Sequence, residues 1–552
     1  MFFKFLELLK SLSIKERKLL GAAGLVFIVS GIFFGLQTFY SETEAKPVEG
    51  GSYVEGVIGQ PIAINPLIVG DNDPDRDLIE LLFASLSDIA QTIKSDEAKK
   101  VWTITLKTDL LWSDGEEITS DDVLFTISVI QDPDARSPYF ATWQGVLAEK
   151  STEHELKLTL KNPYAFFEDN IQNLKVAPSH IFDNIPPQNF RLSDYNLKPV
   201  GSGPYLFNGY TKRPDGFIEK YELIANPNYA GQKAYIRKFT VKFFANKSDA
   251  IDALNGKKID GLGGLEKSDL DDLTINHHVV TASRPRYYAV FLNQSTSLPL
   301  KEKGVRLALH YATNRSALLA DVLDNQGVVE KGPIPASITG YDDAIFTDSL
   351  FDIELASTTL DKAGWKIGED GIRSKVIQKS KVTLEFDIIV PEVRFLVDTA
   401  KQLQQDWHAV GISLNPVIIK PSDVIVSAIK PRNYQMVLFG NTLNNNPDIF
   451  SFWHSSQRFD PGLNLSLFSD KTVDGLLESV RQDTQEETRL QSLSKIQKLI
   501  NDQKPAVFLY SPDYIYVTST SLGGFTAKSI AIPSNRFDEV AGWYLKTARV
   551  FK

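Results

Sequence analysis

The chain has 552 residues, of which 43% are hydrophobic and 23% are charged, and its formal net charge is −10. This length predicts two or three domains, and the mildly acidic balance argues against a general nucleic-acid-binding protein. The sequence contains no cysteine, which excludes disulfides, thiolate catalysis, cysteine-based metal centres and a lipoprotein anchor that needs an N-terminal cysteine.

An uncharged apolar run at residues 19–36 is the first predicted element. At about 1.5 Å per residue it spans roughly 27 Å, close to the hydrocarbon thickness of a bilayer. Basic residues precede it, so the positive-inside rule predicts a cytoplasmic segment at 1–18, a transmembrane anchor at 19–40 and export of the rest. A cleaved signal peptide, with a weak cleavage site at 43–45, is the alternative, but the length of the run favours an anchor. We therefore expect a single-pass protein of the cell membrane with an extracytoplasmic domain, periplasmic or extracellular.

Residues 41–52 are polar and rich in glycine, which predicts a flexible linker between the membrane and the domain. A strand is expected at 53–58, and apolar residues at helical spacing predict a helix at 78–86.

The stretch from 101 to 131 has the clearest local pattern. Alternating apolar residues at 101–106 predict a strand. Thr119 and Asp122 have the spacing of a capping box, so a helix is expected to begin there and to run toward Pro133.

Further along the chain, apolar strand regions are expected at 239–244 and 505–517. Residues 393–410 carry an apolar stripe at helical spacing, followed by Gly411 as a C-cap and a strand from Ile412.

No catalytic or metal-binding constellation is recognisable in the sequence. The seven histidines are scattered, and Asp121 and Asp122 fall at a helix start, where carboxylates favour the helix dipole. Because hydrolase motifs are also missing, we expect a binding protein rather than an enzyme, without cofactor or metal.

Residues 102–126 resemble the signature of the large solute-binding proteins of peptide-type ABC importers, the oligopeptide- and dipeptide-binding members of solute-binding protein family 5. The sequences PVGSGPY at 199–205, GPIP at 332–335 and LDKAGW at 360–365 match further family motifs in family order. The resemblance extends over residues 53–530, and this collinearity distinguishes it from chance.

The resemblance implies an α/β, two-lobed fold like that of periplasmic binding proteins, in the large three-domain form of type II, behind the N-terminal helix. Domain I would combine residues 51–84, 199–284 and 504–552. Domain II would be 85–198, and domain III would be 285–503.

The loop at 440–453 is the predicted ligand-binding element, because the matching family segment lines the cleft. In the family, an acidic residue of this segment holds a peptide's α-ammonium. In this chain the matching position falls at Leu443 or Asn444, and neither is charged. A buried ammonium prefers a paired anion, so free-amine peptides are disfavoured unless Asp448 or another acid supplies the charge. A simple polar loop is the alternative. The candidate ligand-binding residues are Asn441, Asn444, Asn445, Asn446, Asp448 and Trp453, with Arg394 as a candidate for a ligand carboxylate.

The predicted function is capture of peptides between the lobes by a monomer, and delivery to an ABC-transporter permease and its ATPase. Three alternatives remain. The first is the same fold binding an oligosaccharide, an opine, a nickel chelate or haem. The second is a tethered peptide receptor or chaperone, and the third is an enzyme.

Overall fold

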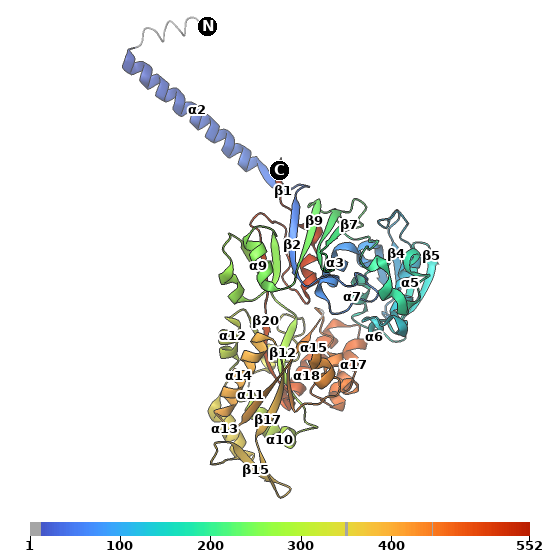
Figure 1. Cartoon of the computed structure of the whole chain (residues 1–552), viewed down its shortest axis with the longest axis vertical. Helices are drawn as coiled ribbons and strands as arrows, with labels where there is room; N and C mark the ends of the chain where they lie inside the picture. Colours follow the sequence, from blue (N-terminus) through green and yellow to red (C-terminus); the bar gives the residue numbers. More distant parts are fainter. Residues whose placement is uncertain (1–12, 348–350, 444) are drawn as a thin grey trace.

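The structure is a computed structural model that describes residues 13–347, 351–443 and 445–552. Within these residues the chain forms two α/β lobes, each built on one large β-sheet, and a long helix projects from the first lobe (Figure 1). Asn444, one of the candidate ligand-binding residues, lies outside the described residues.

The first lobe contains a seven-stranded sheet in the order β11-β21-β10-β2-β9-β8-β7. Alternate residues on these strands, including Tyr53, Phe239 and Val241, are buried, as the period of two of a strand requires. All seven strands lie inside the three stretches that we assigned to domain I. They are β2 (Ser52–Ile58), β7 (Tyr205–Lys212), β8 (Ile218–Ala225), β9 (Lys238–Phe244), β10 (Gly261–Leu265), β11 (His278–Ala282) and β21 (Tyr514–Thr518).

A four-stranded antiparallel sheet, in the order β3-β4-β6-β5, extends the same lobe. One hydrophobic core joins the two sheets, with Tyr53 at one end and Trp102 at the other. The strand and capped helix predicted at 101–131 are confirmed, since β4 covers Val101–Leu106 and Thr119 and Asp122 form the capping box of α5. The elements are β3 (Ala90–Ser95), β4 (Val101–Leu106), β5 (Leu147–Thr152), β6 (Glu155–Thr159), α5 (Ser120–Ile130) and α7 (Phe167–Gln172).

The helix predicted at 78–86 ends earlier than expected. Helix α3 (Asp73–Leu82) stops at Leu82, and a separate short helix, α4 (Leu86–Ile89), follows with Ser85 as its N-cap. The backbone N–H groups of Ser202 and Gly203 donate to the Leu82 carbonyl over 2.9 and 2.8 Å. The predicted C-terminal boundary was wrong because these partners are distant in sequence.

The second lobe contains a six-stranded sheet in the order β13-β20-β12-β19-β17-β18. It is buried on both faces: Val290 and Leu292 pack in one core, and Ala289 and Phe291 in another. This explains why its strands have continuous apolar sequences. The elements are β12 (Arg286–Leu292), β13 (Gly327–Val329), β17 (Glu385–Pro391), β18 (Ser413–Ile419), β19 (Met436–Thr442), β20 (Ala506–Pro512), α11 (Lys303–Tyr311), α12 (Arg315–Leu323), α14 (Arg394–His408), α17 (Lys471–Gln482) and α18 (Glu486–Gln503).

The apolar region expected at 505–517 is two strands in two different sheets. We placed the chain from residue 504 onward in domain I, but β20 pairs with β12 and β13 of the second lobe. Only β21, which starts at Tyr514, belongs to the first lobe. The chain crosses from one lobe to the other at Asp513. The sequence could not predict this point, because an apolar run carries no information about which sheet it joins.

Helix α2 covers Ile14–Glu42, has no buried residue, and is long and apolar enough to cross a membrane. The linker expected at 41–52 is partly ordered: β1 (Thr43–Pro47) pairs antiparallel with β22 (Thr547–Phe551) at the other end of the chain. The helix and the C-terminus therefore meet (Figure 1). Local composition could not predict this pairing with the distant C-terminal strand.

Candidate functional site

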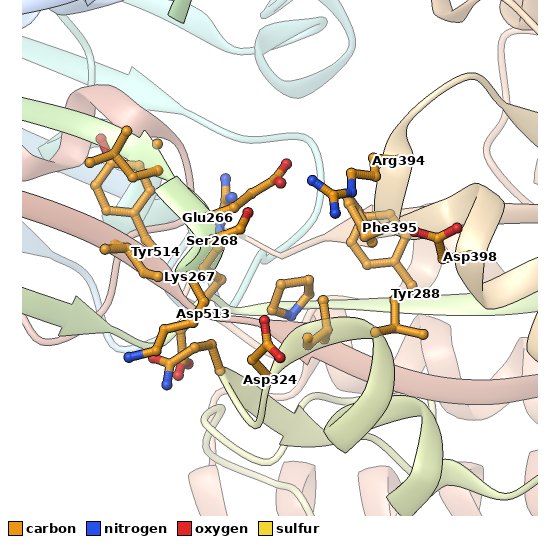
Figure 2. A pocket seen from close by; sticks show the side chains of 18 of the residues that line it. Glu266, Lys267, Ser268, Tyr288, Asp324, Arg394, Phe395, Asp398, Asp513 and Tyr514 are labelled. Carbon is orange, nitrogen blue, oxygen red and sulfur yellow. The ribbon is translucent and has the colours of Figure 1, made fainter. Parts of the chain in front are cut away.

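A cavity of about 360 Å³ lies between the lobes. The first lobe contributes residues 264–268, at the end of β10 and directly after it. The second lobe contributes residues from 321–326 and 394–398, at helix ends (Figure 2). The remaining walls come from 284–288 and 512–515, where the chain passes between the lobes. A volume of this size suits a small ligand.

The chain passes between the two large sheets twice, once between β11 and β12 and once at Asp513, between β20 and β21. Both crossings line the cavity. A rotation of one lobe against the other would therefore bend the chain beside the ligand space, which is the geometry of hinge closure.

Two arginines stand on the first crossing. Arg284 lies over the Tyr514 ring, 5.7 Å from its centroid, and Arg286 Nη1 donates to the Tyr288 hydroxyl over 3.3 Å. The Nε atoms of both arginines are buried without an acceptor, and neither arginine forms an ion pair with any described residue. Burial and the neighbouring Arg286 charge lower the pKa of Arg284 to about 10, so the Arg284 side chain is still cationic at neutral pH.

The acids of the cavity divide into two groups. Glu266 and Asp398 form ion pairs with lysines that do not line the cavity. Lys247 Nζ lies 3.8 Å from Glu266, and Lys401 Nζ lies 2.9 Å from Asp398. Asp321, Asp324 and Asp513 form no ion pair with a described residue, and burial raises the pKa of Asp513. The cavity thus presents cations and anions that lack internal partners.

Among the described candidate ligand-binding residues, Arg394 at the start of α14 is the one that lines this cavity (Figure 2). It is exposed, and its role as a carboxylate-binding residue stays a prediction.

The described residues of the asparagine-rich loop have partners within the protein. Asn441 Nδ2 donates to the Tyr287 hydroxyl over 2.8 Å, and Asn446 Nδ2 donates to Asp169 over 3.2 Å. Asn445 Oδ1 accepts the Ser529 hydroxyl proton over 3.1 Å. These contacts occupy groups that we expected to meet a ligand.

The charged and aromatic candidates of this loop are also engaged. Asp448 pairs with Arg481 and accepts the Tyr164 hydroxyl proton over 2.7 Å. Trp453 is fully buried in the core of the second lobe. Leu443, one of the two positions where the resemblance places the family's ammonium-binding acid, is in the same core, 3% exposed; the other, Asn444, lies outside the described residues. No ammonium can bind at that buried apolar position.

Sequence reasoning missed Arg284, Arg286, Asp324 and Asp513. The sequence contained one signal: Arg284-Pro285-Arg286 places two cations at the start of an apolar strand, where charged residues are unusual. The two aspartates give no such local pattern.

A cavity between two α/β lobes that are joined by two crossing segments defines a ligand-binding protein of the hinged, two-lobed class. Residues 86–460 match the family described as bacterial extracellular solute-binding proteins, family 5 Middle, and the chain belongs to this family.

The chain is 26% identical over 503 residues to the oligopeptide-binding protein AppA of Bacillus subtilis, covering 88% of this chain and 90% of AppA. A structure of AppA in complex with a nonapeptide has a TM-score of 0.73 at 24% identity, covering 91% of this chain and 100% of that one. The substrate-binding protein CtaP of Listeria monocytogenes has a TM-score of 0.78 at 23% identity, with 90% and 99% covered. NikZ of Campylobacter jejuni in complex with Ni(L-His) has a TM-score of 0.74 at 24% identity, with 89% and 99% covered. The predicted family and periplasmic-binding-protein fold are thereby confirmed.

Proposed function

We propose that the protein is a membrane-anchored, extracytoplasmic peptide-binding protein that delivers its ligand to an ABC-transporter permease. The observation that carries the proposal is the interlobe cavity, whose unpaired charges of both signs suit a zwitterion. The relative AppA is named an oligopeptide-binding protein and has been solved with a nonapeptide.

The ligand would favour the closed arrangement of the lobes, because only that arrangement lets both walls contact it. Binding then shifts the population toward the closed form, which the permease would recognise. A cavity of about 360 Å³ has room for a short peptide or part of a longer one.

The ligand's ammonium would meet Asp324 or Asp513. The position equivalent to the family's acid is Leu443 or Asn444, neither of which is charged, and Asp448 already neutralises Arg481. Asp513 is the best candidate among the cavity acids without an ion pair, since it is partly buried whereas Asp321 and Asp324 are exposed.

The anchor would be helix α2, with its basic N-terminal flank in the cytoplasm. We also propose that the chain comprises three domains as predicted, except that the last stretch of domain I begins at Asp513 and β20 belongs to domain III.

A nickel chelate is the second candidate ligand, because the similar NikZ structure contains Ni(L-His). Among the described residues no group of histidine, aspartate and glutamate could hold a metal ion, so a chelate would have to bring its own ligands. Its acidic groups would then meet the cavity's cations.

Native mass spectrometry of the detergent-solubilised full chain tests the peptide proposal. We expect peptides to be released on denaturation and mixed peptide pools to raise the unfolding temperature. Release of a metal chelate or another solute, together with no shift by any pool, would contradict it.

A further inference from the structure

The arginine pair is held in place by its backbone. Arg286 N–H donates to the Arg284 carbonyl over 2.8 Å, and the Ser511 hydroxyl donates to the same carbonyl over 3.0 Å. Leu443 N–H donates to the Pro285 carbonyl over 2.7 Å. Ser511 in β20 and Leu443 directly after β19 therefore fix the backbone of this tripeptide.

The charges around the pair leave it without an anion. Asp73 interacts electrostatically with both arginines, but its carboxylate pairs with Arg76 at 3.6 Å. The guanidiniums contact neutral groups. Arg284 lies over the Tyr514 ring, and Arg286 lies over the Tyr288 ring and donates to the Tyr288 hydroxyl and the Ala531 carbonyl. Two like charges in a partly buried cavity are unfavourable unless an anion joins them.

We propose that Arg284 and Arg286 form a carboxylate-binding subsite at the hinge end of the cavity, so that the protein selects ligands with an acidic group. This inference rests on the proposed function, because it requires that the cavity is the ligand site. A guanidinium matches a carboxylate with two parallel hydrogen bonds, and the unsatisfied Nε atoms supply donors for that geometry. The acid can be a peptide's C-terminal carboxylate or a side-chain carboxylate.

Three pools of mixed-sequence tripeptides distinguish these sources in binding measurements on the solubilised full chain. The first pool has free carboxyl termini and neutral side chains, the second has C-terminal amides and neutral side chains, and the third has C-terminal amides with one aspartate or glutamate. We expect the second pool to bind at least tenfold more weakly than the first, as loss of charge-assisted hydrogen bonds implies. Tight binding of the third pool would assign the subsite to side-chain acids as well. Equal binding of the first and second pools to the unaltered protein would overturn the inference while leaving the peptide proposal intact.

The double variant Arg284→Gln, Arg286→Gln should remove the preference, so that the first and second pools bind with equal affinity. Arg213→Gln is the matched control, since Arg213 is an exposed arginine far from the cavity lining, paired with Asp215. If the double variant does not fold, the comparison of pools on the unaltered protein still decides.

If no pool binds, the peptide proposal fails and the subsite is tested on the ligand that co-purifies. An acidic ligand, retained by the unaltered protein and lost by the double variant, would support the subsite. A neutral ligand, a ligand that both proteins retain equally, or no ligand at all would overturn it.

Discussion

Asp448 and Arg481 form a forked ion pair in which Arg481 Nε lies 3.0 Å from both carboxylate oxygens and Nη2 lies 2.9 Å from Oδ2. The Arg481 guanidinium also lies over the Phe450 ring, 3.9 Å from its centroid. The Tyr164 hydroxyl, from the segment that follows β6, donates to the same carboxylate, and burial together with the Asp448 charge raises the pKa of Tyr164. Asp448 therefore connects the second lobe to the four-stranded part of the first.

Asp448→Asn should weaken this connection more than it weakens ligand binding. Loss of the charge leaves Arg481 without its anion in a site where the Asp448 side chain is only 10% exposed, so we expect a loss of about 2 kcal/mol in stability. Thermal unfolding and peptide titration of the same sample check this. A large loss of affinity with unchanged stability would instead place Asp448 in the ligand site.

Asp513→Asn should weaken ligand binding more than it weakens the stability of the fold. If Asp513 receives the ligand's ammonium, its neutralisation should lower the affinity for peptides with a free amino terminus about tenfold, the scale of one charge-assisted hydrogen bond. N-acetylated peptides should be unaffected. Asp398→Asn is the control, because Asp398 also lines the cavity but already pairs with Lys401. Equal losses with free and acetylated peptides would contradict the assignment.

The sequence was sufficient where the interacting residues are close along the chain. The alternation around Trp102 predicted β4 correctly, and the capping residues Thr119 and Asp122 predicted the start of α5. Both patterns depend on residues that are close along the chain. The partner of β20 could not be predicted, since an apolar strand fits either sheet.

The internal partners of the candidate site residues could not be predicted, for the same physical reason. Alignment located the loop that contains Asp448, but not that Arg481 on α17 occupies its carboxylate. Arg284 and Asp513 come together only because both chain crossings pass through one hinge. Charges gathered by tertiary structure have no spacing rule in sequence.

Glu330 should make stability depend on pH. It is 1% exposed, accepts one hydrogen bond from Ala336 N–H at 3.0 Å, and burial raises its pKa to about 8. Because the folded protein holds this proton more tightly than the unfolded chain, its stabilising effect is complete below pH 4.5 and is lost as pH rises toward 8. The loss is on the order of 5 kcal/mol, at about 1.4 kcal/mol per pKa unit.

Glu330→Gln keeps the shape of the protonated acid and removes its titration. Its unfolding temperature should equal that of the unaltered protein near pH 4.5 and exceed it near pH 9. Glu116→Gln, in an exposed turn, serves as control. Parallel pH profiles for Glu330→Gln and the unaltered protein would show that the carboxyl is ionised in the fold.

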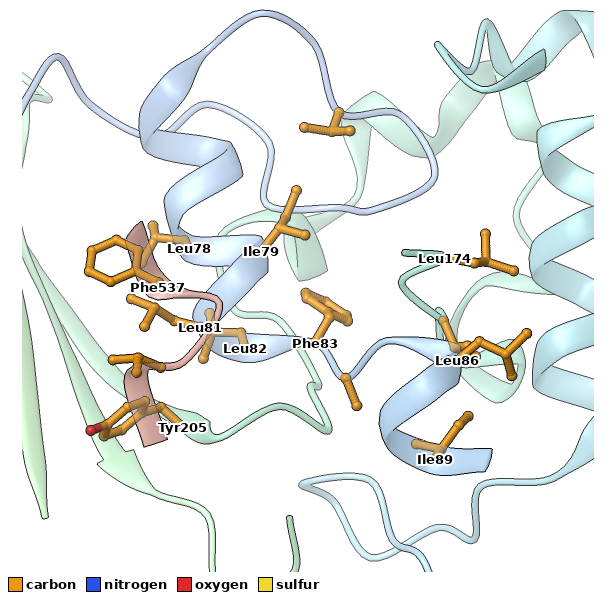
Figure 3. Packing of buried hydrophobic residues seen from close by; sticks show 14 of the residues in the cluster. Leu78, Ile79, Leu81, Leu82, Phe83, Leu86, Ile89, Leu174, Tyr205 and Phe537 are labelled. Carbon is orange, nitrogen blue, oxygen red and sulfur yellow. The ribbon is translucent and has the colours of Figure 1, made fainter. Parts of the chain in front are cut away.

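Gly203→Ala should prevent correct packing at the end of α3. A Cβ at residue 203 would lie 2.6 Å from the Leu82 carbonyl carbon and 2.7 Å from Phe83 N, and these backbone atoms cannot move aside. Neither Gly201 nor Gly203 has a positive φ, so close approach rather than backbone conformation requires glycine in this motif. Figure 3 shows Leu82 and Phe83 in the core that the shift would disturb.

The expected loss for Gly203→Ala is about 3 kcal/mol, the range of an overpacked core. Gly209→Ala is a matched control, because nothing lies within 4 Å of its added Cβ. Denaturant unfolding measures both, and similar small losses for the two variants would contradict the close approach.

The pairing of β1 with β22 controls how the domain meets its helix. Lys552 N–H donates to the Glu42 carbonyl over 2.9 Å, and Arg549 Nη1 donates to the Thr43 carbonyl over 3.1 Å. The Phe39 and Phe551 rings lie 6.5 Å apart. A segment held in this way is a short fixed connection, unlike the flexible linker that its composition predicts.

Cysteine cross-linking tests this register without interference, because the chain has no cysteine of its own. Ala45 and Arg549 are direct partners in the ladder, so the pair Ala45→Cys, Arg549→Cys should form an intramolecular disulfide under mild oxidation. Ala45→Cys with Thr547→Cys is the control, because Thr547 pairs with Pro47 and lies two positions out of register. The opposed pair should cross-link at least tenfold faster, as measured by mass spectrometry of tryptic fragments. Equal rates for both pairs would mean that the strands slide past each other and that the helix is joined to the domain by a loose tether after all.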